Sequence, residues 1–126
     1  MEAHVTQRRA QVGARSHHAG AAAERSVADH YRRAGHRIDH CRWRGRSGEI
    51  DLVARQGADV IFVEVKASGT HEQAAARISA RQVTRLQAAA REFLAGEPGG
   101  QDTGARFDVA LVDGRGRIEI LPNAFL

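Results

Sequence analysis

The segment from Glu49 to Lys66 constrains the fold of this chain most, because it predicts two strands joined by a tight turn. Residues 49–55 alternate between polar and apolar side chains, as a strand with two different faces does. Residues 60–66 are rich in β-branched side chains and apolar on both faces in their first half, which is typical of a central strand. Between them, Gln56-Gly57-Ala58-Asp59 is a turn signal. On the first strand we expect one face to carry Ile50, Leu52 and Ala54 and the other to carry Glu49, Asp51 and Val53.

The length of the turn decides which residues of the two strands lie opposite each other. A two-residue turn at Gly57-Ala58 and a four-residue loop give the same register, in which Asp51 lies opposite Glu64 and Glu49 lies opposite Lys66. Side chains two residues apart share a face, so all four project to the same side of the sheet. Directly opposed Cβ atoms of antiparallel strands are about 5 Å apart. The sequence therefore predicts one compact cluster of three carboxylates and an ammonium group.

This cluster has the chemistry of a metal site. Two opposed carboxylates repel each other, so stability alone would not select Asp51 opposite Glu64. Mg²⁺ or Mn²⁺ would cancel the repulsion and leave coordination positions for water and a phosphate oxygen. Lys66 is the single lysine among 19 basic residues, and an ammonium, unlike a guanidinium, can release a proton. We therefore treat Asp51, Glu64, Lys66 and Glu49 as candidate catalytic residues, with Lys66 orienting a water or stabilising developing charge. The alternative is that residues 64–66 are a strand end that reaches solvent.

The remaining segments complete the order α-β-β-β-α-β-β, a mixed α/β domain with helices packed on a sheet. We expect helices at residues 21–34 and 79–95, strands at 36–44, 106–112 and 117–121, and loops at 67–72 and 97–104. Ser79 is a candidate N-cap of the second helix, whose predicted buried stripe is Val83, Leu86, Ala90 and Phe93. Residues 1–19 lack periodicity and predict a disordered basic tail, so that one domain spans residues 20–126.

The composition excludes several classes of protein. No apolar stretch approaches the roughly 18 residues of a membrane span, and the arginines near the N-terminus are not followed by the apolar block of a secretory signal. A single cysteine, Cys41, excludes an internal disulfide and a cysteine-cluster zinc site, and we expect it to be a buried small residue. A cytoplasmic protein without membrane contact is the expectation.

Basic charge is concentrated in the first 46 residues, where ten arginines and four acids give a net charge of +6. The rest of the chain, with nine basic and eleven acidic residues, has a net charge of −2. This distribution suits a polyanion-binding surface beside a metal-binding one. Arg42 and Arg44 flank Trp43, with Arg46 just after, and predict a phosphate-binding edge near the metal. Trp43 is either a base-stacking residue or, as is more frequent for a lone Trp on a strand, part of the core. For residues 1–19, biased codon usage explains the arginines as well as phosphate binding does.

Several segments together resemble the restriction-endonuclease-like (PD-D/E-x-K) nuclease superfamily, and within it the small bacterial YraN-like family. Residues 48–54 (GEIDLVA) and 60–66 (VIFVEVK) carry the motif aspartate, the motif glutamate and the lysine. Glu24 is similar to the glutamate of the family's N-terminal helix. Residues 106–109 (RFDV) and 122–125 (PNAF) resemble its C-terminal signatures. The resemblance covers about residues 20–126.

The resemblance implies a fold with a four-stranded mixed core sheet flanked by helices, and a Mg²⁺- or Mn²⁺-dependent active site. Asp51 and Glu64 would ligate the metal, with the main-chain carbonyl of Val65 assisting. Lys66 would be catalytic, and Glu24 would be an accessory acid. The substrate would be DNA, with hydrolysis leaving a 5′-phosphate.

The chain also departs from the family pattern. The proline before the motif aspartate is absent, as is common in this family, and Ala23 stands where a glycine usually precedes the helix glutamate. A lysine often found near the start of the second helix is replaced by Arg81 or Gln82. Arg81 therefore joins the candidate nucleic-acid contacts.

Two functions remain open from the sequence. The first is a metal-dependent nuclease that hydrolyses DNA, including branched or single-stranded forms. The second is a catalytically idle nuclease-fold module that binds nucleic acid or a protein partner, since a fold does not prove an activity. The intact set of Asp51, Glu64 and Lys66 favours the first, and the small size of the chain keeps the second open. A homodimer is equally open.

Overall fold

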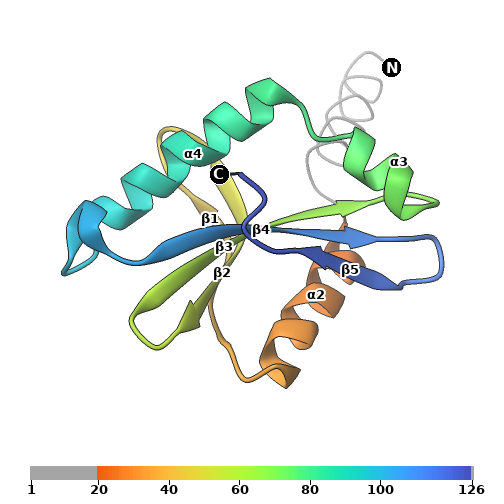
Figure 1. The fold of residues 1–126 in the computed structure, drawn as a ribbon, viewed down its shortest axis with the longest axis horizontal. Helices are drawn as coiled ribbons and strands as arrows, with labels where there is room; N and C mark the ends of the chain where they lie inside the picture. Colours follow the sequence, from red (N-terminus) through yellow and green to blue (C-terminus); the bar gives the residue numbers. More distant parts are fainter. Residues whose placement is uncertain (1–19, 126) are drawn as a thin grey trace, which may run out of the picture.

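A computed structural model describes residues 20–125 of the chain (Figure 1). Its helices are α2 (Ala21–Arg33), α3 (His71–Ala76) and α4 (Ala80–Ala95), with a short 3-10 helix η1 (Gly100–Asp102). Its strands are β1 (Arg37–Arg44), β2 (Glu49–Gln56), β3 (Asp59–Ala67), β4 (Ala105–Val112) and β5 (Ile118–Leu121). The predicted disordered tail at residues 1–19 lies outside the described residues. No helix within residues 20–125 is long and apolar enough to cross a membrane.

The five strands form one mixed sheet in the order β1-β2-β3-β4-β5. Neighbouring strands are antiparallel except for β3 and β4, which are parallel. The predicted α/β fold class is confirmed, and β3 is the central strand as expected. The sheet has one strand more than the four-stranded core that the resemblance implies, because the short β5 pairs at the edge of β4. Helix α3 was not predicted and begins within the loop expected at 67–72, and its N-cap Thr70 accepts a hydrogen bond from Gln73 N at 3.1 Å.

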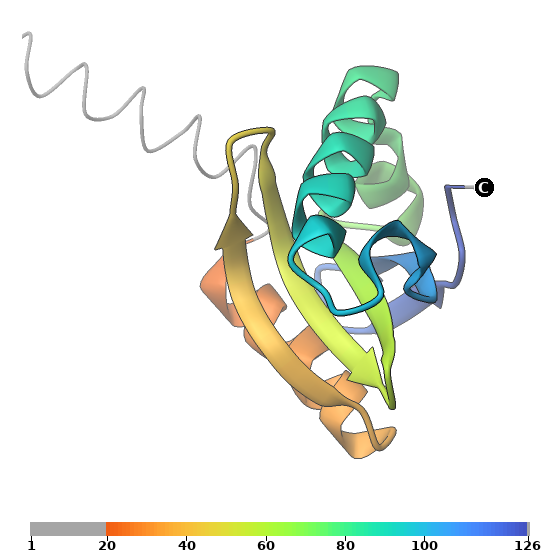
Figure 2. The same cartoon turned by 90° about the vertical axis from the view of Figure 1, so that its left-hand side faces the viewer.

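Helices cover both faces of the sheet, α2 on one side and α3 with α4 on the other (Figures 1 and 2). The side under α2, here called the α2 face, buries a single apolar cluster that includes Val27, Leu52 and Val63. The opposite side, the α4 face, buries two separate clusters. The cluster under α4 includes Phe62 and Phe93, and the cluster under α3 includes Val109 and Leu111 together with Ala74 of the helix. The gap between these two clusters positions the site described below.

The amphipathic pattern of α4 explains how it docks. Ser79 is its N-cap and accepts a hydrogen bond from Gln82 N at 3.1 Å, as predicted. The helix buries five apolar side chains: Leu86, Ala89, Ala90, Phe93 and Leu94. Val83 is only half-buried, because the helix diverges from the sheet toward its N-terminus. That divergence leaves room for polar side chains between α4 and the strands.

The predicted hairpin register is confirmed. Strands β2 and β3 are joined by a two-residue turn at Gly57-Ala58, and their pairing runs from Gln56 with Asp59 to Leu52 with Val63. The expected face of Ile50 is wrong, since Ile50 packs in the cluster under α4 and not with Leu52 in the α2-face cluster. The regular pleat is lost at this end of β2, where the pairing with β3 has already stopped.

One expectation for strand β1 is wrong, and one alternative that the sequence left open is decided. Cys41 is exposed, not buried, because β1 is an edge strand whose residues Cys41 and Arg42 are left uncovered by α2. Arg42 itself has a left-handed backbone (φ 55), although β1 keeps its register with β2 on either side of it, Cys41 with Leu52 and Trp43 with Ile50. Trp43 packs edge-on against Phe93, with ring centroids 5.3 Å apart, and so belongs to the core.

Candidate active site

Asp51 lies where strands β2 and β3 cease to pair. Its side chain is 3% exposed, and its Oδ2 accepts a hydrogen bond from the main-chain N–H of Val65 at 2.9 Å. A carboxylate oxygen thus takes the place of a main-chain carbonyl next to the last strand pair, Leu52 with Val63. The bond ties the start of β2 to the end of β3 while the two strands separate, and the space between them is available to side chains.

Glu64 is the second buried acid of this region. It is 4% exposed, and its Oε1 accepts a hydrogen bond from Gln82 Nε2 of α4 at 3.1 Å. Lys66, 3% exposed, places its Nζ 3.3 Å from the same oxygen. Two donors, one of them charged, therefore converge on a single oxygen of Glu64. The predicted proximity of Lys66 to Glu64 on one face is confirmed.

The two carboxyl groups interact with each other. The pKa of Glu64 is raised to about 9, first because burial disfavours its charged form, and then by the charge of Asp51 and a hydrogen bond with it. The ammonium of Lys66 acts in the opposite direction but does not cancel these effects. In the metal-free protein Glu64 is therefore protonated at neutral pH. A proton lies where two anions would otherwise repel, which is the place a divalent cation would take.

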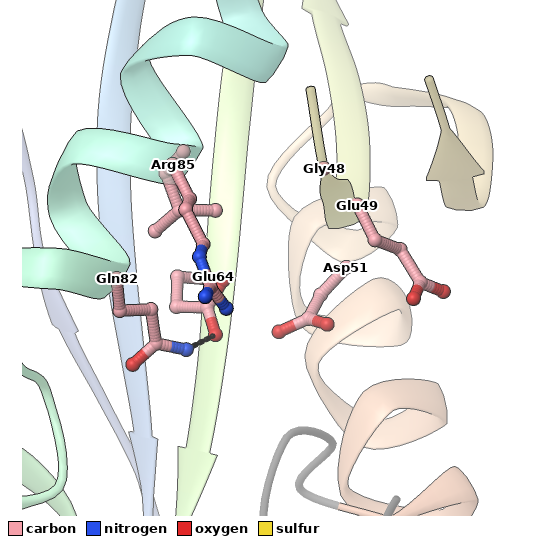
Figure 3. A pocket seen from close by; sticks show the side chains of 7 residues that line it. Gly48, Glu49, Asp51, Glu64, Gln82 and Arg85 are labelled. Atoms are coloured by element: carbon pink, nitrogen blue, oxygen red, sulfur yellow. Dashed lines mark hydrogen bonds between the residues drawn. The ribbon is translucent and has the colours of Figure 1, made fainter. Parts of the chain in front are cut away.

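A cavity of about 250 Å³ opens over these carboxyl groups (Figure 3). Strand residues Gly48, Glu49, Asp51 and Glu64 line one part of it, and Gln82, Arg85 and Leu86 of α4 line the other. Figure 3 shows Asp51 and Glu64 on adjacent strands with their carboxyl groups in the same space, beneath Arg85. The cavity is thus open to a small polar ligand on its acidic floor.

The neighbours of Glu64 and Lys66 on this face of the sheet are apolar. Glu64 pairs with Val109 and Lys66 pairs with Leu111 across the parallel β3–β4 ladder, and both partners are buried in the cluster under α3. On the other side, Phe62 belongs to the cluster under α4. Two buried charged or protonated side chains therefore interrupt what would otherwise be a continuous apolar face. Such an interruption is costly to stability and is characteristic of functional sites.

Comparison with known proteins gives the family. The model of the uncharacterised protein family UPF0102 matches residues 23–112. This chain belongs to the UPF0102 family. It is the same family as the YraN-like one that the motifs resemble. The motif strands β2 and β3 lie entirely within the matched residues.

Relatives in the UPF0102 family match nearly the whole chain. A UPF0102 protein of Cereibacter sphaeroides (strain KD131) is 62% identical over 110 residues, covering 87% of this chain and 94% of its own. One of Ruegeria pomeroyi (strain DSS-3) is 60% identical over 113 residues, covering 90% and 92%. One of Roseobacter denitrificans (strain OCh 114) is 50% identical over 119 residues, covering 94% and 92%. Their names state the family and no activity.

Two acids named from the sequence lie apart from the Asp51–Glu64 pair. Glu24 of α2 accepts a hydrogen bond from Arg42 Nε at 3.0 Å and lines a different cavity, of about 470 Å³, beside α2. Glu49 lines the cavity of Asp51, but Figure 3 shows its carboxylate directed away from Glu64, and its Oε2 lies 3.7 Å from Arg44 Nη2. The expected opposition of Glu49 and Lys66 is not formed, because β2 and β3 separate before reaching it.

The four arginines named from the sequence fall into two groups. Arg42 and Arg44 are engaged with Glu24 and Glu49, respectively. The side chains of Arg46 and Arg81 are exposed and form no hydrogen bond or ion pair with any residue in the described range 20–125. These two guanidinium groups are free for a phosphate, while the other two would have to exchange a carboxylate for it.

Helix α4 contributes two residues to the site, of which the sequence analysis left Arg85 unnamed. Of the two candidates for the position of the family's lysine, Gln82 reaches Glu64. Arg85, three residues later, lines the cavity beside Leu86. A helical wheel could have found both, since Gln82 and Arg85 are one turn apart and adjoin the buried stripe. What the wheel could not give is the rotation of α4 relative to β3, which depends on Phe93 and Ala89.

The donor set fits a hard divalent cation. Among the described residues no group of three or more His, Cys, Asp or Glu side chains is arranged to hold a metal. Mg²⁺ needs fewer, since it is usually bound through one or two carboxylates plus water and substrate phosphate. Asp51 and Glu64 supply two carboxylates in one cavity. The carbonyl of Val65 as a third ligand stays a prediction, although the N–H of the same residue is held by Asp51.

Proposed function

We propose that this protein is a metal-dependent nuclease that hydrolyses phosphodiester bonds in DNA. One observation carries the proposal. Two buried carboxyl groups, those of Asp51 and Glu64, line the same cavity, and the buried Nζ of Lys66 lies 3.3 Å from Glu64 Oε1. Burying this trio lowers stability unless a ligand compensates it. Mg²⁺ or Mn²⁺ with a phosphodiester would be such a ligand, and the family resemblance points to the same chemistry.

The residues divide the work of hydrolysis. Asp51 and Glu64 would hold the cation, which when bound lowers the pKa of a coordinated water and stabilises charge on the phosphate. Gln82 keeps Glu64 oriented through its hydrogen bond to Oε1. The buried ammonium of Lys66 would donate a hydrogen bond to the attacking water or to a phosphate oxygen as negative charge develops there. The separation of β2 and β3 gives the phosphate access to these groups.

Positive charge around the cavity supports a nucleic-acid substrate. Arg85 forms part of the cavity wall, and Arg81 lies one turn before it on α4. Arg46 belongs to the β1–β2 turn that leads to Gly48, another wall residue. One exposed arginine thus lines the cavity, and two more lie on the helix and the turn that supply other wall residues. Phosphates on either side of the scissile one would be attracted to the rim and the cation to the floor.

The proposal is tested with a cleavage panel of duplex, single-stranded, flap and four-way-junction DNA in Mg²⁺ and in Mn²⁺. Wild type should cut at least one substrate, and Asp51→Ala should cut none at a measurable rate. Asp102→Asn, which removes one exposed acid at η1, is the control and should cut like wild type. Equal cleavage by wild type and Asp51→Ala would mean a contaminating nuclease.

A non-catalytic nucleic-acid-binding module is the second candidate. Its support is Gln82, a neutral side chain bonded to Glu64 at the position where the resembled family often carries a lysine. Loss of that cation would weaken charge stabilisation at the phosphate. In this case wild type and Asp51→Ala should bind the DNA panel equally and neither should cleave it.

A further inference from the structure

One side of α4 carries a row of contacts that runs beyond the cavity. Gln82 reaches Glu64, and Arg85 follows in the cavity wall. One turn further, Ala89 Cβ lies 3.8 Å from where a side chain on Gly48 would begin. Glu92 ends the row at the β1–β2 turn. Spacings of three and four residues place these four side chains along one line of the helix.

Glu92 binds the turn with both of its carboxylate oxygens. Oε2 accepts a hydrogen bond from Arg46 N, and Oε1 accepts one from Ser47 N, both at 2.9 Å. Two successive main-chain N–H groups that converge on one anion form a nest, which orients the backbone strongly. These two bonds lower the pKa of Glu92, so the carboxylate is charged at neutral pH. The turn also closes on itself through Gly45 N to Gly48 O at 2.9 Å.

The sequence of the turn is adapted to this contact. A Cβ at Gly45 would lie 2.6 Å from Glu92 Oε2 and 2.5 Å from the ring of Trp43. Any side chain at that position would force the Glu92 carboxylate and the Trp43 ring to shift. Trp43 in turn packs edge-on against Phe93, the neighbour of Glu92. The turn is therefore held to the helix by an apolar contact on one side and by two hydrogen bonds on the other.

We infer that Glu92 is a positioning residue for nucleic-acid binding, which holds the β1–β2 turn on α4 and thereby fixes Arg46 on the turn that ends at Gly48, a wall residue of the cavity of Asp51 and Glu64. The inference rests on the proposed function. It explains a carboxylate at this place: an acid close to the rim would repel phosphates unless it were used for another purpose. Glu92 directs its charge into the N–H groups of the turn, while the guanidinium of Arg46 is left free for a phosphate.

The test compares Glu92→Gln with Glu72→Gln, which removes the same charge from an exposed position on α3. Glutamine at position 92 accepts through one oxygen only, so one N–H of the turn loses its partner. Affinity for a duplex oligonucleotide is measured in Ca²⁺ over a series of KCl concentrations. Glu72→Gln should bind as tightly as wild type or slightly more tightly, because it loses a negative charge. Glu92→Gln should bind more weakly, with a slope of log affinity against log salt shallower by up to about 0.9, one phosphate contact.

Two further measurements separate positioning from a general loss of stability. Arg46→Ala should show the same change of slope, and the double variant should be no weaker than Arg46→Ala alone, since both remove one contact. Amide exchange should accelerate at Arg46 and Ser47 in Glu92→Gln and not in Glu72→Gln. Gly45→Ala, whose Cβ would meet the carboxylate of Glu92, provides a second variant with the same expected loss of slope.

The outcomes are distinct. Glu92→Gln that matches Glu72→Gln in affinity and slope overturns the inference, and so does strict additivity with Arg46→Ala. Wild type that shows no DNA binding at any salt concentration removes the proposed function itself, and the inference with it. Wild type that binds while Glu92→Gln binds equally removes the inference alone.

Discussion

The two faces of the sheet both bury acidic side chains, but they satisfy them differently. On the α2 face, Asp108 is 1% exposed and has donors on both oxygens. Tyr31 donates its hydroxyl to Oδ2 at 2.7 Å, while Arg106 Nε and Asn123 N each donate to Oδ1 at 3.1 Å. Burial and the bond to Asp108 raise the pKa of Tyr31, so this hydroxyl stays a donor at any ordinary pH.

On the α4 face, two acids are buried beside each other, and each also has another partner: Val65 N donates to Asp51, and Gln82 donates to Glu64. Glu64 retains a proton because it is buried beside Asp51, and Lys66 and Gln82 share one of its oxygens. Asp108 joins α2, β4 and the C-terminal segment in one set of hydrogen bonds, so its carboxylate holds these parts of the fold together. The Asp51–Glu64 pair lies where β2 and β3 separate, with Gln82 of α4 bonded to Glu64, and it lines a cavity. The difference indicates a structural role for Asp108, and it agrees with the cation site that we propose for Asp51 and Glu64.

The largest expected effect would break the α2 face. Asp108→Asn removes the charge that Arg106 and Tyr31 share and presents an NH₂ group to one of these donors. We expect the free energy of unfolding to fall by about 2–4 kcal/mol, as for a buried charged network that loses one member. Urea unfolding measures it, with the exposed Asp102→Asn as control. Equal loss in both variants would contradict a structural role specific to Asp108.

The second prediction concerns chemistry on the α4 face. Lys66→Arg keeps the positive charge, but a guanidinium cannot release a proton and differs in shape from the ammonium. Cleavage of the best substrate should fall by roughly 10²-fold, the scale of one positioned proton-transfer or charge-stabilising group. Single-turnover cleavage in Mg²⁺ gives the rate, and binding in Ca²⁺ should change little. A variant that cuts at nearly the wild-type rate would return Lys66 to the role of a strand end.

The third prediction uses the raised pKa of Glu64. Its folded pKa of about 9 lies above the ordinary value of 4.5, so its contribution to stability is complete below pH 4.5 and is lost as the pH rises toward 9. Glu64→Gln cannot ionise and escapes this loss. In EDTA the advantage of the variant over wild type should therefore grow by up to about 4 kcal/mol between pH 5 and pH 8, because wild type loses about 1.4 kcal/mol per pH unit in this window.

Urea unfolding at the two pH values gives the difference directly. Adding Mn²⁺ at pH 8 should stabilise wild type more than Glu64→Gln, because only wild type exchanges its proton for the cation. A gain that is the same at pH 5 and pH 8 would mean that Glu64 is ionised in the metal-free protein.

The site was accessible from the sequence where local rules decide it. A short turn at Gly57-Ala58 fixes the register, and the two-residue period of strands then places Asp51 beside Glu64. The same rules failed where the strands stop being regular. Ile50 lies on the face opposite to the expected one, and Glu49 does not lie opposite Lys66, because Asp51 binds the main chain of β3 just beyond the paired residues.

Other features depend on long-range packing. Helix α3 has six residues, too few for a periodic signal in the sequence. The one local indication of this helix is its N-cap residue, Thr70. Cys41 was expected in the core, but its exposure follows from the place of β1 at the edge of the sheet. The contacts of Gln82, Arg85 and Glu92 depend on how α4 is rotated over the sheet, which the spacing of its apolar residues restricts but does not determine.

The smallest expected effect tests which face the nucleic acid contacts. Arg85 lines the cavity on the α4 face, and Arg25 is an exposed arginine of α2 on the opposite side of the sheet. Both alanine variants lose one positive charge, so any general electrostatic effect is the same for both. If DNA lies over the cavity, Arg85→Ala should make the slope of log affinity against log salt shallower by up to about 0.9, while Arg25→Ala leaves it unchanged. Binding of one duplex in Ca²⁺ at several KCl concentrations distinguishes them. A change of slope in Arg25→Ala alone would place the DNA on the α2 face, far from the carboxylate pair, and would leave the buried acids of the α4 face without the substrate assigned to them.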